Sequence, residues 1–402
     1  MRRRTLLTGL GSATLLATPH IARAQWPGVT KDTITIGHTI PYSGPASAYG
    51  VIGHAHAAFF KMLNEQGGVA GRKVNFISLD DGYLPPKTVE QVRRLVEQDQ
   101  ISFLFSPLGT ANNTAIQKYM NQKKVPQLFV ATGADKWGDP EHYPWTIGWQ
   151  PSYRTEAQIY AKYMRKEKPN AKLAVIYQND DFGKDYLIGL KDALGADYAK
   201  FVVKELTYEI TDATIDSQAV SLQASGADVL VTAATPKFAA QMIRKVADMN
   251  WKPMHFLSNV SASVGAVIKP AGVEKAVGII TSAYIKDSTD PMWATDPGIK
   301  KWRTWMDKYM PGADQTDGGY LAAYGLDQTM IQLFKQCGND LSRENIMHQA
   351  GNLQPHECDI LLPGIQPSTT PKNFHPIRQM QLSKWDGASW KLFGEIIEGT
   401  GA

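Results

Sequence analysis

The sequence predicts an α/β fold made of two doubly wound sheets. From Thr33 the chain alternates strand-like and helix-like segments, which is the order of a parallel sheet covered by helices on both faces. The alternation begins again after Trp145. Residues 1–24 have the pattern of an export signal, so about 378 residues remain for the folded protein. This length is too great for one ordinary hydrophobic core and indicates two domains.

The first 24 residues have the pattern of an export signal. Arg2-Arg3-Arg4 precede an apolar run from Leu6 to Ala17, and Ala22-Arg23-Ala24 has the small-x-small form of a cleavage site. We therefore expect an exported protein cleaved after Ala24, and the segment from Arg3 to Leu7 resembles a twin-arginine signal. Cleavage removes four arginines and no acid, so the formal charge of +4 becomes zero. A neutral chain gives no reason to expect nucleic acid or an anionic membrane surface as a partner.

In the first half, residues 33–39 alternate apolar and polar side chains with a period of two, as an outer strand would. The further elements expected are a helix with Ile52, Ala55, Phe59, Met62 and Leu63 on one face, a strand at 73–79, a helix from Pro85, a strand at 103–105, a helix at 111–122 and a strand at 128–130. These elements complete the first sheet.

The second half predicts a helix at 152–166 and buried strands at 173–177, 201–203, 229–232, 256–257 and 278–281. The tail predicts helices at 302–309 and 320–334, then strands at 379–382 and 390–393 around an Asp386-Gly387 turn. A tail that returns to structure formed earlier indicates several crossings between the two domains.

Two loops of small residues follow neighbouring strands of the first half, at 106–110 and 131–134. Open α/β sheets bind ligands at the carboxyl ends of their strands. Thr110 as a helix N-cap would leave backbone N–H groups facing an anion, so we expect a cradle for a carboxylate. The alternative is that Thr110 only caps its helix and Gly133 only makes a turn.

The two cysteines, Cys337 and Cys358, are separated by 21 positions. Export to an oxidising compartment would permit a disulfide between them. The sequence does not supply the geometry that a bridge requires, so two buried thiols remain the alternative.

A set of short motifs, spread over nearly the whole chain after the signal, resembles the leucine/isoleucine/valine-binding family of periplasmic substrate-binding subunits of ABC transporters. The motifs, in order, are Tyr42–Gly50, Asn64–Gly71, Asp80-Asp81, Gly109-Thr110, Ala131–Gly133, Asp180–Gly183 and Trp385–Gly387. The resemblance implies a type I periplasmic binding protein, in which two Rossmann-like lobes joined by three hinge crossovers close on a ligand. It implies one lobe from residues 33–149 and 285–370, and a second from residues 150–284 and 371–402.

Carried over by position, the resemblance assigns the ligand site. Gly109 and Thr110 would bind the ligand carboxylate, and Ala131 and Gly133, with Thr132 between them, would contribute backbone contacts. Tyr49 and Phe182 would form aromatic walls from opposite lobes. Thr235 would face the cleft from the second lobe, and Tyr320 would lie nearby. A buried carboxylate must be hydrogen-bonded, and charge-assisted bonds supply most of that compensation. For Tyr49 and Phe182 ordinary packing is the alternative.

One departure from the family bears on the ligand. Members that bind amino acids hold the α-ammonium with an acid just after the strand that ends here near Leu257, whereas residues 258–264 contain no acid and place Asn259 or Val260 there. A buried ammonium without a carboxylate is costly. We therefore expect a small apolar or aromatic carboxylate, with a branched-chain amino acid or a small amide or urea as alternatives. Asp180-Asp181 could supply the acid, but we expect them to cap the next helix.

Motifs of an enzyme are missing from the sequence: it has no Gly-x-Ser-x-Gly elbow, no Walker loop and no His-Glu-x-x-His zinc helix. His356, Cys358 and Asp359 fall short of a four-ligand metal site. We therefore expect no catalysis, no cofactor and no metal. The expected partners are a small-molecule ligand and an inner-membrane ABC permease, with the protein itself a monomer. The alternative is a periplasmic sensing module that feeds a receptor.

Overall fold

The structure is a computed structural model that describes residues 26–399. The expected export signal, its cleavage after Ala24 and the twin-arginine pattern lie outside these residues. Within residues 26–399, none of the helices has the length and apolar content needed to span a membrane.

The first sheet has five parallel strands in the order β2-β1-β3-β4-β5. They are β1 (Thr33–Ile40), β2 (Lys73–Asp80), β3 (Phe103–Phe105), β4 (Gln127–Val130) and β5 (Thr146–Gly148). The helices between them are α1 (Gly50–Glu65), α2 (Pro85–Glu97) and α3 (Thr110–Lys123). The predicted alternation is confirmed, and β5 is an additional short strand.

The position of β1 differs from the prediction. It lies between β2 and β3 and not at an edge of the sheet, and its residues 36–40 are all buried. Two of its residues, His38 and Gly37, suit this central position because of the side chains and backbone groups beside them. His38 Nδ1 lies 2.8 Å from the carbonyl oxygen of Phe105, and a Cβ on Gly37 would come within 2.8 Å of Ile101. The prediction that residues 33–39 form an outer strand was therefore wrong, although they do form a strand.

The second sheet has seven strands in the order β12-β11-β10-β9-β8-β6-β7. The strands are β6 (Leu173–Gln178), β7 (Val202–Tyr208), β8 (Val229–Ala233), β9 (Met254–Leu257), β10 (Ile280–Ala283), β11 (Gln379–Trp385) and β12 (Trp390–Glu398). The pairs formed among β6–β10 are parallel, whereas β11 is antiparallel to both β10 and β12. The predicted hairpin around Asp386-Gly387 is thus confirmed.

The helices of the second half include several that begin at a residue able to cap them. They are α4 (Tyr153–Glu167), α5 (Asp181–Leu194), α6 (Tyr198–Phe201), α7 (Asp216–Ala224), α8 (Pro236–Asp248), α9 (Lys269–Ala271), α10 (Pro297–Tyr309), α11 (Gly318–Cys337) and α12 (Arg343–Ala350). The side chain of Ser152 accepts a hydrogen bond from the first turn of α4, and the side chain of Asp180 does so for α5. The expected capping role of Asp180 is confirmed.

The apolar core follows the period of two along the strands. In β6, Leu173 and Val175 belong to one buried cluster, whereas Ala174 and Ile176 belong to a second cluster on the other face. The first cluster continues into the five-stranded sheet through Phe103 and Phe105. Both faces of each sheet are therefore covered, as a parallel sheet requires.

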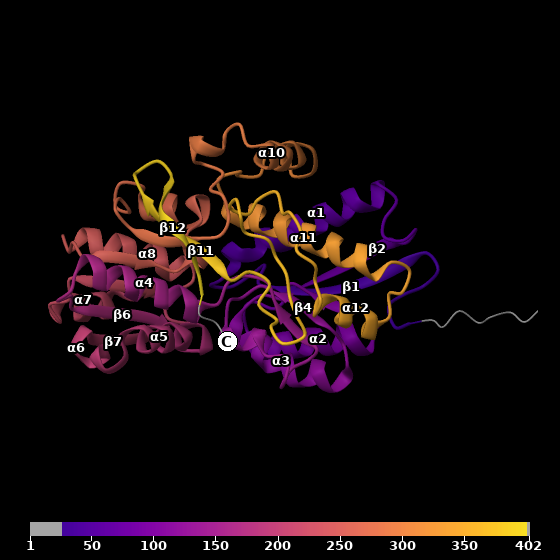
Figure 1. Ribbon diagram of the computed structural model, residues 1–402, viewed down its shortest axis with the longest axis horizontal. Coiled ribbons are helices and arrows are strands. Elements are labelled where there is room, and N and C mark those ends of the chain that lie inside the picture. Colours follow the sequence, from indigo (N-terminus) through magenta and orange to yellow (C-terminus); the bar gives the residue numbers. More distant parts are fainter. Residues whose placement is uncertain (1–25, 400–402) are drawn as a thin grey trace, which may run out of the picture.

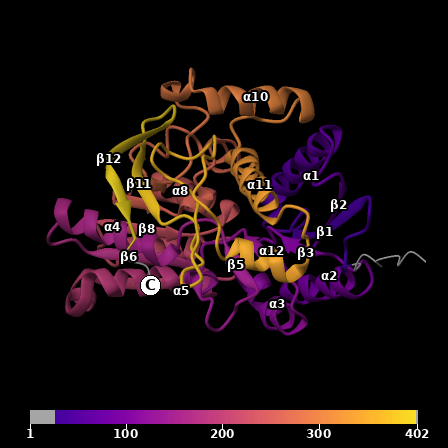
Figure 2. The ribbon, with the colours of Figure 1, turned by 45° about the vertical axis from the view of Figure 1, so that its right-hand side comes forward.

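The chain passes three times between the two sheets and the helices packed on them. It leaves the first sheet after β5, returns from β10 to α10 and α11, and crosses back from α12 to β11. In Figure 1, β1, β2 and β4 lie on the right and β6 and β7 on the left, and the yellow segment after α12 runs across to β11. Figure 2, turned by 45°, keeps α11 beside α1, against which it packs. The lobe boundaries stay a prediction.

The two cysteines are free and buried, so the disulfide that the sequence left open is absent. Cys358 Sγ lies 3.5 Å from the carbonyl oxygen of Gly325 and 3.4 Å from Gln328 Oε1, near the middle of α11. Cys337 is the last residue of α11, so about 18 Å of helix separates it from Gly325 at 1.5 Å per residue. A disulfide needs Cα atoms within about 7 Å.

Candidate functional site

A large cavity lies between the carboxyl ends of the first sheet's strands and residues of the second sheet. It encloses about 1330 Å³ of empty space, counting the part that is open to solvent. Eight of the ten predicted site residues line it: Tyr49, Gly109, Thr110, Ala131, Thr132, Phe182, Thr235 and Asn259. The structure therefore brings together positions from six separate loops and helix starts.

Two predicted residues do not line this cavity. Gly133 faces the crossing segment instead, where its carbonyl oxygen accepts a hydrogen bond from the Tyr153 N–H at 2.8 Å and a Cβ would meet the Pro151 carbonyl oxygen at 2.4 Å. Tyr320 lies in the first turn of α11, between Gly319 and Leu321, which do line the cavity. The turn role that the sequence allowed for Gly133 fits its position better than a ligand contact.

The loop before α3 forms a small polar wall of the cavity. The N-cap of α3 is Gly109, with φ +99°, and not Thr110 as predicted, because Thr110 is already the first helical residue. The φ of Gly109 lies in the region that favours glycine, and a Cβ there would meet Tyr83 and Asn112 at 2.8 Å. The first N–H groups of α3 have no acceptor within the helix. They are available to an anion.

The hydroxyl groups of Thr110 and Thr132 lie within hydrogen-bond distance of each other, across the two loops. Both side chains are buried and both residues line the cavity. Each hydroxyl carries one hydrogen, and the bond between them uses only one of the two. The pair thus keeps one hydrogen that can be donated to a ligand oxygen.

Aromatic rings make up much of the remaining wall. Tyr49 and Phe182 were expected, but four further rings were not foreseen: Tyr83, Tyr153, Tyr284 and Trp390. Tyr153 packs on Phe182 with ring centroids 4.7 Å apart. These residues come from a turn, a helix start, a crossing segment and a terminal strand. For Tyr83 the sequence offered a local signal, since it stands two positions after the Asp80-Asp81 motif.

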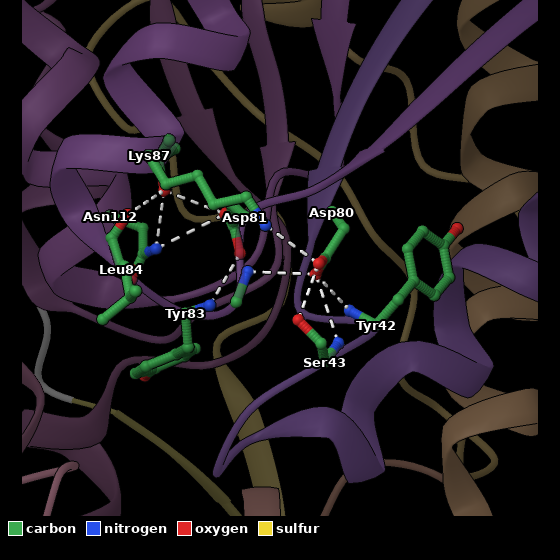
Figure 3. A network of polar contacts seen from close by, with 10 residues as sticks. Tyr42, Ser43, Asp80, Asp81, Tyr83, Leu84, Lys87 and Asn112 are labelled. Atoms are coloured by element: carbon green, nitrogen blue, oxygen red, sulfur yellow. Dashed lines mark hydrogen bonds and ion pairs between the residues drawn. The ribbon is translucent and has the colours of Figure 1, made fainter.

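A polar network at the end of β2 holds the turn that carries Tyr83, one of the residues that line the cavity (Figure 3). Asp80 Oδ1 accepts hydrogen bonds from the N–H groups of Tyr42, Ser43 and Gly82 at 2.9, 3.1 and 3.0 Å. Its Oδ2 accepts from Ser43 Oγ at 2.6 Å and from Lys87 Nζ at 2.9 Å. Burial acts to raise the pKa of Asp80, but these hydrogen bonds outweigh it and lower that pKa below its usual range.

Asp81 holds Tyr83 in place on the other side of the same turn (Figure 3). Its Oδ1 accepts from the Tyr83 N–H at 2.9 Å, and its Oδ2 accepts from Thr88 Oγ1 at 2.9 Å and from Asn112 Nδ2 at 3.4 Å. Burial raises the pKa of Asp81 to about 6. The two adjacent aspartates thus position the loop before Tyr49 and the ring of Tyr83.

Residues of the two sheets meet across the cavity. Tyr49 Oη donates to the Val260 carbonyl oxygen at 3.2 Å. Ser263 Oγ lies 2.9 Å from Asp317 Oδ1 and accepts from the Gly318 N–H at 3.1 Å, which joins the segment after β9 to the start of α11. The structure therefore describes the two units in contact around the cavity.

The acidic residues that line the cavity already have donors. Asp287 accepts from the N–H groups of Thr289 and Trp390, both at 2.9 Å. Asp317 Oδ1 accepts from Ser263 Oγ and from the Gly319 N–H. At the position where an acid was expected from the resemblance, both Asn259 and Val260 line the cavity. Asp180 is bound to the first turn of α5, and burial raises its pKa to about 6.

Ser106, His56 and Asp327 are linked in the order known from serine hydrolases. His56 Nε2 lies 3.1 Å from Ser106 Oγ, and His56 Nδ1 lies 2.7 Å from Asp327 Oδ1. All three residues are fully buried and none lines the cavity. Burial lowers the pKa of His56 to about 3 and raises that of Asp327. With no access for a substrate, these residues connect α1, the loop after β3 and α11.

No group of three or more histidine, cysteine, aspartate or glutamate side chains suited to a metal ion occurs within residues 26–399. The cluster of His356, Cys358 and Asp359 therefore does not form such a group.

Comparison with known proteins agrees with this architecture. A family model described as periplasmic binding protein matches residues 33–389. The Leu/Ile/Val-binding protein homolog 3 of Brucella melitensis is 27% identical over 208 residues, which make up 49% of this chain and 53% of that protein. The match thus spans about half the length of that relative.

Solved structures share the fold. A branched-chain amino acid ABC transporter protein from Thermus thermophilus with bound valine has a TM-score of 0.81 and 16% identity, covering 92% of this chain and 98% of its own. A fatty acid ABC transporter substrate-binding protein from Thermomonospora curvata has a TM-score of 0.78 and 20% identity, covering 94% and 95%. An R. palustris solute-binding protein in complex with 4-hydroxybenzoate has a TM-score of 0.75 and 17% identity, covering 92% and 98%.

At these identities the solved structures show the fold alone, a two-lobed α/β architecture of type I. The family model covers nearly all of the described chain. The protein therefore belongs to the family of periplasmic binding proteins.

Proposed function

We propose that the protein is the exported solute-binding subunit of an ABC importer and captures a small apolar or aromatic carboxylate. The observation that carries this proposal is that the two small-residue loops and six aromatic side chains line one cavity. The ligand enters between the two lobes, which close on it around three crossovers. Transfer to an inner-membrane permease follows.

The carboxylate end of the ligand is held by the wall around α3. The free N–H groups of the first turn of α3 and the unused hydrogen of the Thr110–Thr132 pair are donors to an anion. Backbone donors and a helix N-terminus compensate a buried carboxylate without a lysine or arginine. Lys286, which also lines the cavity, is bound to Asp296 at 2.9 Å and to the Asp359 carbonyl oxygen at 2.7 Å.

The remainder of the ligand is apolar or aromatic. Six rings surround the cavity, and a ring packed against aromatic side chains gains about 0.5–1.5 kcal/mol beyond its area. The acids that line the cavity, Asp287 and Asp317, are committed to hydrogen bonds within the protein. An α-ammonium group would therefore lack a free carboxylate, which supports a ligand without one.

Relatives of this fold bind ligands of these classes. One structural neighbour is in complex with 4-hydroxybenzoate, another is named for fatty acids, and a third holds valine. The first two share a carboxylate without an α-amino group. They support the proposed ligand class, and valine defines the competing one.

A ligand screen on the protein beginning at Gln25 tests the proposal. A ligand at 100 times its Kd stabilises the fold by about 2.7 kcal/mol, which raises Tm by several degrees. We expect such a shift with benzoate- or cinnamate-like acids and none with leucine, isoleucine or valine. Micromolar binding of leucine in a calorimetric titration, with the aromatic acids silent, would overturn the ligand class. Co-purification with a receptor in place of a permease would favour the sensing alternative.

A further inference from the structure

Glu156 is a fully buried carboxylate directly behind the cavity wall. It lies on α4, does not line the cavity, and is surrounded by hydrogen-bond donors. Its Oε1 accepts from Tyr160 Oη at 2.5 Å, from the Asn259 N–H at 2.9 Å and from Ser282 Oγ at 2.6 Å. Its Oε2 accepts from Asn259 Nδ2 at 2.6 Å and from Tyr186 Oη. Two of these partners, Asn259 and Ser282, line the cavity.

The Asn259 backbone N–H can only donate, so Glu156 Oε1 is an acceptor. Tyr160 Oη accepts from the Ser282 N–H at 3.1 Å, and its single hydrogen is shared between Glu156 Oε1 at 2.5 Å and the Leu257 carbonyl oxygen at 2.7 Å. The Leu257 carbonyl oxygen near Tyr160 has another donor, Thr281 Oγ1, at 2.8 Å. Burial raises the pKa of Glu156, and the hydrogen bonds from Ser282 and the tyrosines oppose that rise. The net result is a pKa of Glu156 above its usual range, with Oε2 accepting from the side-chain amide of Asn259.

This arrangement decides which way the side-chain amide of Asn259 is turned. Because Nδ2 donates to Glu156 Oε2, the amide oxygen must point away from the carboxylate. The reverse orientation would set two oxygens against each other and lose the hydrogen bond from Nδ2 to Oε2. Within residues 26–399 that amide oxygen has no hydrogen-bond partner, although Asn259 lines the cavity.

We propose that Glu156 is a positioning residue that turns the amide oxygen of Asn259 toward the ligand, so that this wall of the cavity accepts a hydrogen bond from an uncharged donor. The ligand is then a carboxylate that carries a hydroxyl group. This inference rests on the proposed function and adds a second polar contact to it. A hydroxyl suits the amide oxygen because the bond buries no additional charge.

Paired ligands test the inference on the protein from Gln25 onward. Benzoate and the three hydroxybenzoate isomers are titrated calorimetrically into the parent, Glu156→Gln and Asn259→Ala. At least one hydroxybenzoate should bind the parent about 10-fold more tightly than benzoate, as one hydrogen bond allows. In both variants that ratio should fall to about one, with benzoate titrated into the same variant as the reference. Glu167→Gln, at an exposed position of the same helix, is the matched control and should keep the parent's ratio.

A second readout needs no ligand. The side-chain ¹⁵N–¹H signal of Asn259, assigned by its loss in Asn259→Ala, should exchange slowly with water in the parent. In Glu156→Gln it should shift and exchange faster, because the carboxyl acceptor of its hydrogen bond is gone. An unchanged signal, or a hydroxyl preference that survives in Asn259→Ala, would overturn the inference. If no benzoate binds the parent, the proposed ligand class fails, and the Asn259 signal still decides the role of Glu156.

Discussion

Thr110 is the side chain through which the carboxylate site can be probed most directly. The structure moves it from the cap position, which Gly109 occupies, to the first helical position, so its removal does not cost a side-chain cap. Its hydroxyl is paired with that of Thr132 and is buried in the cavity wall. An effect of substitution on binding therefore reports on the ligand and not on the stability of α3.

Thr110→Ala should weaken carboxylate binding roughly 10- to 100-fold, because a hydrogen bond to a charged group is worth about 1.5–3 kcal/mol. Binding should not vanish, since the backbone donors of α3 remain. Thr110→Ser keeps the hydroxyl and is the matched control, expected within a few fold of the parent by calorimetry. Equal affinity of the alanine variant and the parent would place the carboxylate elsewhere.

His255 provides a test of how burial couples folding to pH. It is buried, its Nε2 lies 2.9 Å from Thr232 Oγ1, and burial lowers its pKa to about 3. The unfolded chain binds a proton at a pKa near 6.5, and the folded chain does not until about pH 3. The stability that this residue contributes is therefore full above pH 6.5 and is lost as the pH falls toward 3.

In His255→Gln that dependence should be removed. Below the unfolded pKa, each pH unit costs the parent about 1.36 kcal/mol of stability. As the pH falls from 7 to 5, the free energy of unfolding of the variant should therefore rise by about 2 kcal/mol relative to that of the parent. Urea unfolding at several pH values measures it. A constant difference between the two proteins over this range would show that the pKa of His255 is the same in the folded and the unfolded protein.

At the scale of elements, α11 decides the state of the two thiols. Cys337 ends the helix while Cys358 packs against its middle, so the helix itself keeps them apart. Burial raises the pKa of each thiol to about 12, which leaves almost no reactive thiolate at neutral pH. Both thiols should therefore persist in the exported protein.

We expect a thiol reagent to find two free thiols per chain after unfolding without reductant, and to react slowly with the folded protein. Mass spectrometry of peptides blocked before reduction would identify both positions. A count of zero, or a mass lower by two hydrogens, would contradict the separation of Cys337 and Cys358. Cys358→Ser should leave the Tm nearly independent of reductant, as in the parent.

At the scale of the whole molecule, hydrogen bonds join the units of the two sheets beside the cavity. Ser263 follows β9 of the second sheet, and Asp317 and Gly318 begin α11, which packs on α1 of the first. Ser263 Oγ joins them through two hydrogen bonds of 2.9 and 3.1 Å. Loss of this hydroxyl should favour the open form.

Small-angle scattering of Ser263→Ala tests this. The parent should contract on saturation with a tight ligand, and the variant should need about 10-fold more ligand for the same contraction, since a hydrogen bond to a charged group is lost. Ser225→Ala, whose hydroxyl donates to the Leu222 carbonyl oxygen at 2.6 Å within one unit, is the control. A radius of gyration of the parent that is unchanged at saturation would argue against hinge closure.

The sequence alone determined the alternation of strands and helices, most element positions and eight of the residues that line the cavity. Gly109, Thr110, Ala131 and Thr132 were predictable together because the carboxyl ends of neighbouring parallel strands meet at one edge of a sheet. The capping role of Asp180 was predictable because a cap acts on the next few residues of its own chain. These are consequences of local periodicity and of strand direction.

Only the tertiary structure decided the rest. Tyr83, Tyr153, Tyr284 and Trp390 reach the same cavity from distant parts of the chain, and Glu156 meets Asn259 across 103 positions. The central place of β1 and the separation of the two thiols depend likewise on which elements become neighbours. Local patterns specify the face that a segment buries but not the partner it meets there, because that partner is selected by the packing of whole sheets and helices.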